Sequence, residues 1–349
     1  MAVTSPRAAT DTATRLISLL KERGRSLSSL LIVTHDHPDP DALASAWALA
    51  LLAKKYCRSR VRIGYGGIIG RRENRMMIDS LGLPARPLRA SDLEAPNLAL
   101  VDTQPKFKNN PISARRRPTI IIDHHPKSSS TNADLLLIDE SVGATCTMLA
   151  EALILSGFKV PARLATAIVY GIGSETQNLG REAGRRDIDA YLAFLPKASM
   201  KSLWRMANPP RPASFFHSLA RGIRDAFIIR NIIGVHLREL PNADRVAQMA
   251  DFLLSHEKMR WSIVTGRFDG RLHVSLRTSF ANGEAGALLK SIMGSGRGGG
   301  HKMIAGGSIV VGQTAPEDKW RKAEETLVTE FLNNRGISNP NHRLFPFRD

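Results

Sequence analysis

Cysteine is scarce in this sequence of 349 residues. The chain has only two cysteines, Cys57 and Cys146, and neither stands in a C-x-x-C pair. This argues against a disulfide scaffold and against a cysteine-based zinc site, and it fits a reducing cytoplasm, where we expect the protein to be. No apolar run approaches the roughly 18 residues of a membrane span, and the N-terminus lacks the continuous apolar segment of a signal peptide. We therefore expect no membrane partner.

Aromatic and acidic residues are also few. Aromatic residues make up 6% of the chain, which does not support an extended platform for base stacking. The 32 acidic residues are outnumbered by 49 basic ones, and the formal net charge is +17. A surplus of this size attracts polyanions such as nucleic acids and nucleotides.

The first half of the chain alternates apolar runs with helical patterns. Strands are predicted at 30–34, 61–65, 97–101 and 119–122, and helices at 42–53, 144–156 and 161–172, the last beginning at Pro161. Strands this apolar are typical of a parallel sheet that is covered on both faces. The pattern therefore predicts an α/β fold with a parallel-sheet catalytic domain.

A proline-rich segment, Asn208-Pro209-Pro210-Arg211-Pro212, interrupts this pattern. Beyond it, strands at 228–236, 261–266, 272–278 and 308–311 and helices at 243–255, 284–293 and 316–332 predict a smaller α/β unit. We assign 1–207 to the catalytic domain, 208–225 to a linker, 226–335 to a substrate-binding domain and 336–349 to a tail. We expect the second domain to close over an interdomain cleft.

Acidic and imidazole side chains follow three of the predicted strands. Taken singly, Asp41 would suit the N-cap of the next helix, Asp102 a turn, and adjacent histidines a solvated surface. In a parallel sheet, however, all these strand ends meet at one edge, where open α/β sheets bind their ligands. Carboxylates with a few imidazoles and no thiolate favour manganese or magnesium, and the number of ligands allows two ions. The predicted cluster comprises His35, Asp39, Asp41, Asp102, Asp123, His124 and His125.

The order of these motifs resembles the DHH phosphoesterase superfamily. H-x-x-x-D-x-D is followed by a strand ending in Asp and then by Asp-His-His. The segments 66–74 and 101–105 resemble the branch of nano-RNases and 3′-phosphoadenosine-5′-phosphate phosphatases. The segment 298–306, Gly-Gly-Gly-His-Lys-Met-Ile-Ala-Gly, resembles the signature of the DHH-associated domain. The resemblance covers about residues 28 to 312.

The resemblance implies a role for each motif residue. One ion would be held by His35, Asp39 and Asp102. The second would be held by Asp41, Asp102, His124 and a fourth acid, with Asp102 bridging. We expect Mn²⁺, with Mg²⁺ or Co²⁺ as other candidates. His125 would lie near the scissile phosphate and Asp123 would orient the imidazoles, so we treat these two as the catalytic pair.

The fourth acid departs from the family pattern. Aspartate is usual there, but Gly173-Ser174-Glu175-Thr176 places Glu175 at that position. The additional methylene displaces the carboxylate by about a bond length. Glu175 is therefore either a metal ligand with altered geometry or a capping or solvent-facing residue.

A glycine-rich stretch in the second half is the predicted anion-binding loop. Glycines let backbone amides approach a phosphate closely, although a flexible linker has a similar composition. The resemblance implies that this loop and a strand arginine grip the substrate phosphate; an ordinary strand-face charge is an equal alternative for the arginine. The predicted substrate-binding residues are Arg277, Gly298, Gly299, Gly300 and His301.

These features favour an enzyme that hydrolyses phosphoester bonds in short oligoribonucleotides, linear dinucleotides or nucleoside 3′,5′-bisphosphates. A longer-strand exonuclease and an inorganic pyrophosphatase are related alternatives. The glycine-rich loop and the segment 66–74 disfavour the pyrophosphatase. Because of Glu175, a catalytically weakened nucleotide-binding or sensor protein is the alternative from another class. A homodimer is left open.

Overall fold

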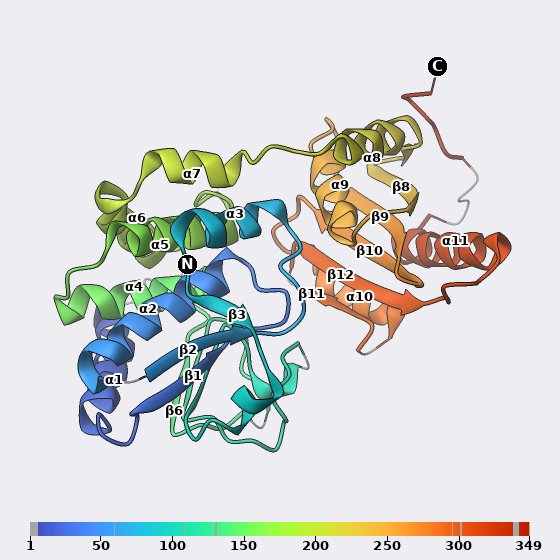
Figure 1. The fold of residues 1–349 in the computed structure, drawn as a ribbon. Helices are drawn as coiled ribbons and strands as arrows, with labels where there is room; N and C mark the ends of the chain where they lie inside the picture. Colours follow the sequence, from blue (N-terminus) through green and yellow to red (C-terminus); the bar gives the residue numbers. More distant parts are fainter. Residues whose placement is uncertain are drawn as a thin grey trace. The chain divides into compact units, whose positions relative to one another are not determined.

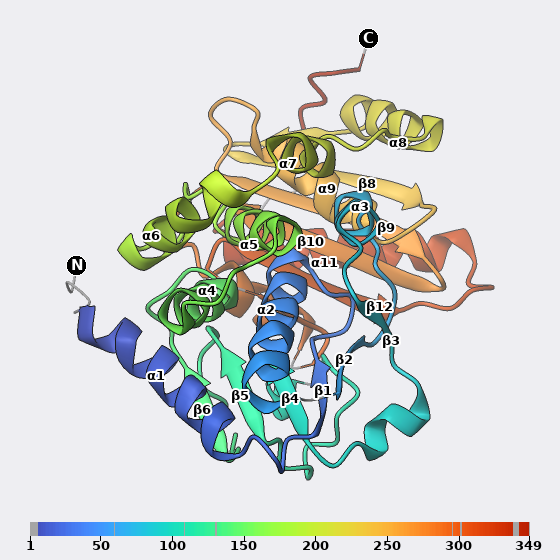
Figure 2. The same cartoon turned by 60° about the vertical axis from the view of Figure 1, so that its left-hand side comes forward.

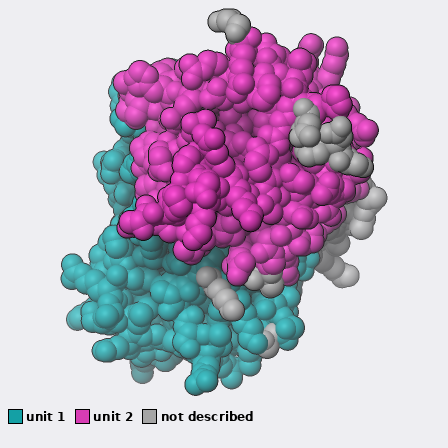
Figure 3. All heavy atoms as spheres, turned by 90° about the vertical axis from the view of Figure 1, so that its right-hand side faces the viewer, with its two compact units in different colours: residues 1–209 teal, residues 210–349 magenta. Residues whose placement is uncertain are grey.

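The computed structural model describes residues 6–58, 60–107, 109–129, 131–294, 296–300, 302–337 and 342–348. The chain divides into two compact units, residues 1–209 and 210–349, which Figure 3 colours separately. Each unit has its own sheet and its own hydrophobic core. Within the described ranges, no helix is long and apolar enough to cross a membrane.

The sheet of the first unit consists of parallel strands in the order β3-β2-β1-β4-β5-β6. Their bounds are β1 Ser29–Val33, β2 Arg60–Tyr65, β3 Ala85–Pro87, β4 Leu98–Val101, β5 Ile120–Asp123 and β6 Leu135–Ile138. From β1 the chain continues to β2 and β3 on one side, and from β4 to β5 and β6 on the other. The strand order therefore reverses between β1 and β4. The carboxyl ends of these two strands form a topological switch point of the sheet.

Helices cover one face of this sheet (Figures 1 and 2). The bounds are α1 Pro6–Glu22, α2 Pro40–Cys57, α3 Arg72–Leu81, α4 Thr145–Ser156, α5 Ala162–Glu175, α6 Arg185–Phe194 and α7 Met200–Ala207. Helix α2 packs against α5, where Gly171 permits a close approach. A Cβ at Gly171 would lie 3.0 Å from the carbonyl oxygen of Pro40. The small residue thus brings the two helices together near the end of α5 that carries Glu175.

The opposite face of the sheet is covered by shorter segments. The 3₁₀ helix η1, Ala90–Glu94, and the loops before β5 and β6 bury the alternate strand residues Leu31, Val33, Leu98 and Leu100. Burial on both faces explains why the strands read as continuous apolar runs. The structure confirms the predicted parallel α/β class.

The second unit has a mixed sheet in the order β11-β12-β10-β9-β8-β7. The strands are β7 Phe227–Ile229, β8 Ile232–Glu239, β9 Trp261–Phe268, β10 Arg271–Thr278, β11 Gly298–Gly300 and β12 Ile304–Val310. The helices are α8 Ala213–Arg224, α9 Asp244–Leu254, α10 Ala285–Met293 and α11 Glu317–Asn334. One face of the sheet packs with α10 and α11, and the other packs with α9.

Several elements of the chain differ from the sequence prediction. The single strand expected at 228–236 is a hairpin, because Arg230 adopts a left-handed φ of 54° between β7 and β8. Helix α8 lies within the segment predicted as a linker, and Leu344 of the predicted tail pairs with Ile228. Pro161 precedes α5 as its N-cap residue and is not its first residue.

Candidate metal centre

Three loops bring polar side chains to the carboxyl edge of the first sheet. His35 and Asp39 follow β1, and Asp102 follows β4. Strand β5 ends at Asp123, and two histidines follow it directly. The connections after β1 and β4 lead in opposite directions, and this is the position at which open α/β sheets bind their ligands. The sequence pattern predicted the convergence of these three loops.

Asp39 and Asp41 have different local roles at the start of α2. Asp39, not Asp41, is the N-cap of α2: its side chain accepts a hydrogen bond from the Ala42 amide at 2.9 Å. Asp41 lies within the first turn of α2 and is 1% exposed. Its carboxylate accepts hydrogen bonds from the amides of Thr145 at 2.8 Å and Cys146 at 2.7 Å. Asp41 therefore connects the start of α2 with the N-terminus of α4.

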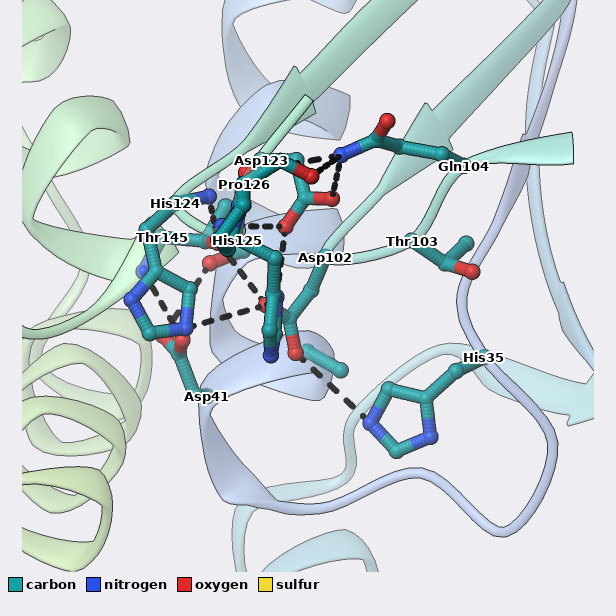
Figure 4. A network of polar contacts seen from close by, with 12 residues as sticks. His35, Asp41, Asp102, Thr103, Gln104, Asp123, His124, His125, Pro126 and Thr145 are labelled. Atoms are coloured by element: carbon teal, nitrogen blue, oxygen red, sulfur yellow. Dashed lines mark hydrogen bonds and ion pairs between the residues drawn. The ribbon is translucent and has the colours of Figure 1, made fainter. Parts of the chain in front are cut away.

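Asp102 lies at the centre of the cluster (Figure 4). One of its carboxylate oxygens is 3.6 Å from His35 Nε2, and the other is 3.7 Å from His124 Nε2. Asp39 Oδ2 is 3.7 Å from His35 Nε2. Among the described residues, the potential ligand atoms form two groups, one of His35, Asp39 and Asp102 and the other of Asp102, His124 and His125. Asp102 belongs to both groups.

These separations fit cation ligands better than hydrogen bonds. A nitrogen–oxygen distance of 3.6 Å is too long for a hydrogen bond. Donors bound at roughly 2.0–2.2 Å to one octahedral cation lie roughly 3 Å apart, so a small contraction would complete the coordination. The donors are carboxylates and imidazoles without a thiolate, the set that suits manganese and magnesium. The residues present therefore fit divalent cations.

The charges in the cluster also favour a cation. Burial and the neighbouring charge of Asp39 raise the pKa of Asp102 well above its usual range. Burial and the charge of Asp102 do the same to the pKa of Asp41. Burial would lower the pKa of His35, but Asp39 and Asp102 raise it to about 10. Carboxylates this close repel one another, so a divalent cation between them would remove a substantial electrostatic penalty.

The two adjacent histidines have opposite properties. Burial and the charge of His125 lower the pKa of His124 to about 4, so its imidazole is neutral and suited to binding a metal. Burial opposes protonation of His125 as well, but hydrogen bonding to Asp123 raises its pKa. His125 Nδ1 lies 2.8 Å from Asp123 Oδ1. Asp123 therefore fixes the orientation of His125.

Gln104 fixes Asp123 in turn. This buried side chain donates to Asp123 Oδ2 at 2.8 Å and to the Pro126 carbonyl at 3.2 Å. Its amide oxygen accepts hydrogen bonds from the Ser128 amide and the Thr131 hydroxyl, both at 2.9 Å. The sequence interpretation gave Gln104 no role, because nothing in the sequence shows which buried carboxylate an amide side chain contacts.

Thr145 is a second residue that the sequence did not indicate. Its hydroxyl donates to Asp102 Oδ1 at 2.8 Å and accepts from the His124 amide at 3.3 Å. Its own amide donates to Asp41. One buried residue at the start of α4 thus contacts three of the proposed ligand positions. A threonine in the first turn of a predicted helix carries no signal by which this role could be found.

Glu175 is the last residue of α5. Burial and the charge of Asp39 raise its pKa to about 7. Its carboxylate lies 4.0 Å from the guanidinium of Arg181. It does not belong to either close group of ligand atoms found among the residues described. Its role as a ligand stays a prediction.

Comparisons with known proteins agree with this geometry. The model of the DHH family N-terminal domain matches residues 29–172, and the DHHA1 domain model matches residues 230–328. An uncharacterized protein of Methanocaldococcus jannaschii is 33% identical over 333 residues, which cover 93% of this chain and 67% of that protein. The chain belongs to the DHH family of phosphoesterases. The family predicted from the motifs is confirmed.

Other similar proteins are more distant. A probable manganese-dependent inorganic pyrophosphatase of Staphylococcus aureus is 26% identical over 151 residues, 43% of this chain and 48% of that protein. Among solved structures, an exopolyphosphatase-related protein from Bacteroides fragilis has a TM-score of 0.72 at 15% identity and covers 96% of this chain and 100% of its own. RecJ from Thermus thermophilus in complex with Mn²⁺ has a TM-score of 0.55 at 14% identity and covers 92% and 55%. Both structural likenesses show the DHH fold alone.

The predicted substrate residues lie in the DHHA1 domain. Arg277 is 5% exposed, and its guanidinium donates to Asp251 at 2.5 Å and to the Ser275 hydroxyl at 2.7 Å. The expected glycine-rich loop is partly a strand: Gly298, Gly299 and Gly300 form β11, which pairs with β12. His301 lies outside the described residues. The role of these residues in binding substrate stays a prediction.

The glycines of β11 have a packing function. A side chain on Gly286 of α10 would overlap the carbonyl of Gly300. Gly300 itself adopts a φ of 150° and lies against the backbone of Ile304. Backbone therefore packs on backbone in this part of the DHHA1 domain, which accounts for part of the glycine run without any ligand.

Proposed function

We propose that this DHH protein is a manganese-dependent hydrolase of short oligoribonucleotides, linear dinucleotides or nucleoside 3′,5′-bisphosphates. The observation that carries the proposal is the position of Asp102 in both groups of ligand atoms. A carboxylate shared in this way suits two neighbouring cations. His35 and Asp39 would complete one site. His124 belongs to the other group, and Asp41 and Glu175, which lie outside both groups among the described residues, would complete that site, with His125 directed to the phosphate.

Two bound cations would polarise the phosphoryl oxygens and activate a water molecule. The chain would provide the positioning. Asp123 stabilises the proton on His125 Nδ1, so the charged imidazole can interact with the phosphate. Gln104 keeps the Asp123 carboxylate aligned with that imidazole. Because this network is buried, water does not compete for the hydrogen bond between His125 and Asp123, and the bond is stronger than it would be in water.

The substrate class rests on charge and on family. The net charge of +17 favours polyanionic substrates. Arg277, the β11 glycines and His301 would bind the terminal phosphate within the DHHA1 domain. We expect the reaction to take place in the cytoplasm, with the nucleotide substrate as partner, no membrane partner, and a homodimer as a further option.

The purified protein tests this directly. It would be incubated with Mn²⁺ and 5′-phosphorylated di- to penta-ribonucleotides, 3′,5′-bisphosphoadenosine and pyrophosphate, beside an Asp102→Asn variant of similar shape. We expect the wild type alone to release mononucleotide or phosphate from the nucleotides. Release from pyrophosphate only would replace the substrate class. No release from any substrate would reject the enzyme.

Glu175 favours a second candidate, a nucleotide-binding protein with weakened catalysis. Its longer side chain stands where aspartate is usual in the family pattern. A Glu175→Asp variant distinguishes the two. A large gain in turnover would support a weakened site, whereas no gain or a loss would support a site adapted to glutamate.

A further inference from the structure

A left-handed turn begins two residues after Glu175. Gln177, Asn178 and Leu179 have φ values of 48°, 56° and 65°. Residues with a Cβ avoid this region, and three in succession are rare even though asparagine tolerates it. The turn is closed by the Asn178 amide, which donates to the Gly173 carbonyl at 2.7 Å. Strain of this kind persists where the surrounding structure enforces it, often at a functional site.

The turn returns the chain towards Glu175. The amide of Arg181 donates to the Thr176 carbonyl at 2.9 Å, which closes the segment. The Arg181 guanidinium then lies 3.4 Å from the Glu175 carbonyl oxygen and 4.0 Å from its carboxylate. The strained backbone therefore places an arginine beside the acid at the edge of the metal centre.

The surroundings of Arg181 differ from those of other buried arginines in this chain. Its side chain is 8% exposed, and its Nε has no hydrogen-bond partner among the described residues. Arg186 and Arg267, which are as deeply buried, each form short hydrogen bonds with two carboxylates: Arg267 is paired with both of its partners, and Arg186 is paired with Glu151 and donates a single bond to Asp139. A buried guanidinium with such loose contacts is costly for stability alone. Its position suggests a role that depends on what occupies the centre.

Glu175 needs a positive neighbour at this place. The charges of Asp39 and Asp102 act unfavourably on the Glu175 carboxylate. Repulsion between like charges therefore favours a rotamer directed away from them. We propose that Arg181 is a positioning residue that holds the Glu175 carboxylate towards the metal centre. Because its guanidinium is almost wholly buried, it acts through Glu175 and not on the substrate. This inference rests on the proposed metal-dependent function.

A double-mutant cycle tests whether Arg181 acts through Glu175. Mn²⁺ affinity would be measured by electron paramagnetic resonance of free Mn²⁺ for the wild type, Arg181→Met, Glu175→Gln and the double variant. We expect Arg181→Met to weaken Mn²⁺ binding roughly tenfold, as for other residues that orient ligands. In the Glu175→Gln background the same change should alter affinity less than twofold. Equal losses in both backgrounds, or none in either, would overturn the inference.

Two further variants separate positioning from folding. Arg267→Met removes an equally buried arginine from the second unit and should lower the melting temperature without changing Mn²⁺ affinity. Arg181→Lys keeps the positive charge and should bind Mn²⁺ more tightly than Arg181→Met does. If Arg181→Met does not fold, Arg181→Lys replaces it in the double-mutant cycle. Failure of the wild type to bind Mn²⁺ would reject the metal centre itself. Normal wild-type binding with an additive cycle would reject only the role of Arg181.

Discussion

Replacing Thr145 by valine is the sharpest test of the organisation of the metal centre. Valine keeps the shape of threonine but removes the hydroxyl that donates to Asp102 and accepts from the His124 amide. A hydrogen bond to a charged carboxylate contributes about 1.5–3 kcal/mol. Since 1.4 kcal/mol is about tenfold in affinity, the loss corresponds to roughly a 10- to 100-fold weaker Mn²⁺ complex. That range agrees with the effect of other groups that orient metal ligands.

Calorimetric titration with Mn²⁺ measures this loss, and circular dichroism confirms that the variant is folded. Thr145→Ser is the matched control, because it keeps the hydroxyl and removes only a methyl group. We expect the serine variant to bind Mn²⁺ within about threefold of wild type while losing about 1 kcal/mol of stability. If valine and serine bind Mn²⁺ equally well, the hydroxyl does not orient Asp102 and the reasoning is wrong.

Three other changes have defined outcomes. The pKa of Glu175 is higher in the folded protein than in the unfolded chain, so this acid favours folding while it is protonated. The metal-free protein should therefore lose stability as pH rises from about 4.5 through about 7. Thermal denaturation in chelator should show a smaller change of stability with pH for Glu175→Gln than for the wild type. Gln177→Gly removes the conformational penalty of a left-handed residue, about 1–2 kcal/mol, but adds an entropic cost of about 0.5–1 kcal/mol. Urea unfolding should therefore show a net gain of about 0.5 kcal/mol in the free energy of unfolding for this variant and none for Gln177→Ala. Gln104→Leu removes the donor to Asp123 and should lower kcat roughly tenfold with little change in KM; an unchanged kcat would show that Asp123 needs no such support.

The convergence of the ligands could be predicted because it depends on strand direction alone. Once 30–34, 97–101 and 119–122 are taken as parallel strands, His35, Asp102 and His124 must reach the same edge of the sheet. No side-chain packing enters that argument, so small errors in strand boundaries do not affect it. Membership of the DHH family was predicted from the same motif order and was confirmed.

The supporting residues could not be predicted, because their roles depend on contacts between distant segments. Thr145 is 43 residues from Asp102, and nothing in the helix pattern around it signals a buried hydroxyl contact. The choice of Asp39 rather than Asp41 as the helix cap depends on where Pro40 begins the helix. The strand β11 was predicted as part of a loop, since composition does not distinguish glycines that bend a chain from glycines that let a backbone pack closely.

Left-handed backbone occurs at or near two of the same carboxylates. Asp102 adopts a φ of 59°, although its amide continues the sheet by donating to the Ile122 carbonyl at 2.9 Å. The sheet thus fixes the backbone of Asp102 while the left-handed φ directs its side chain into the cluster. Asp41 is held by two amides of α4, and Glu175 is followed by the left-handed turn. The left-handed backbone and the hydrogen bonds from the α4 amides hold like charges close together in the metal-free protein, which lowers its stability. Binding of a cation removes this repulsion, so the folded protein is stabilised when the metal binds.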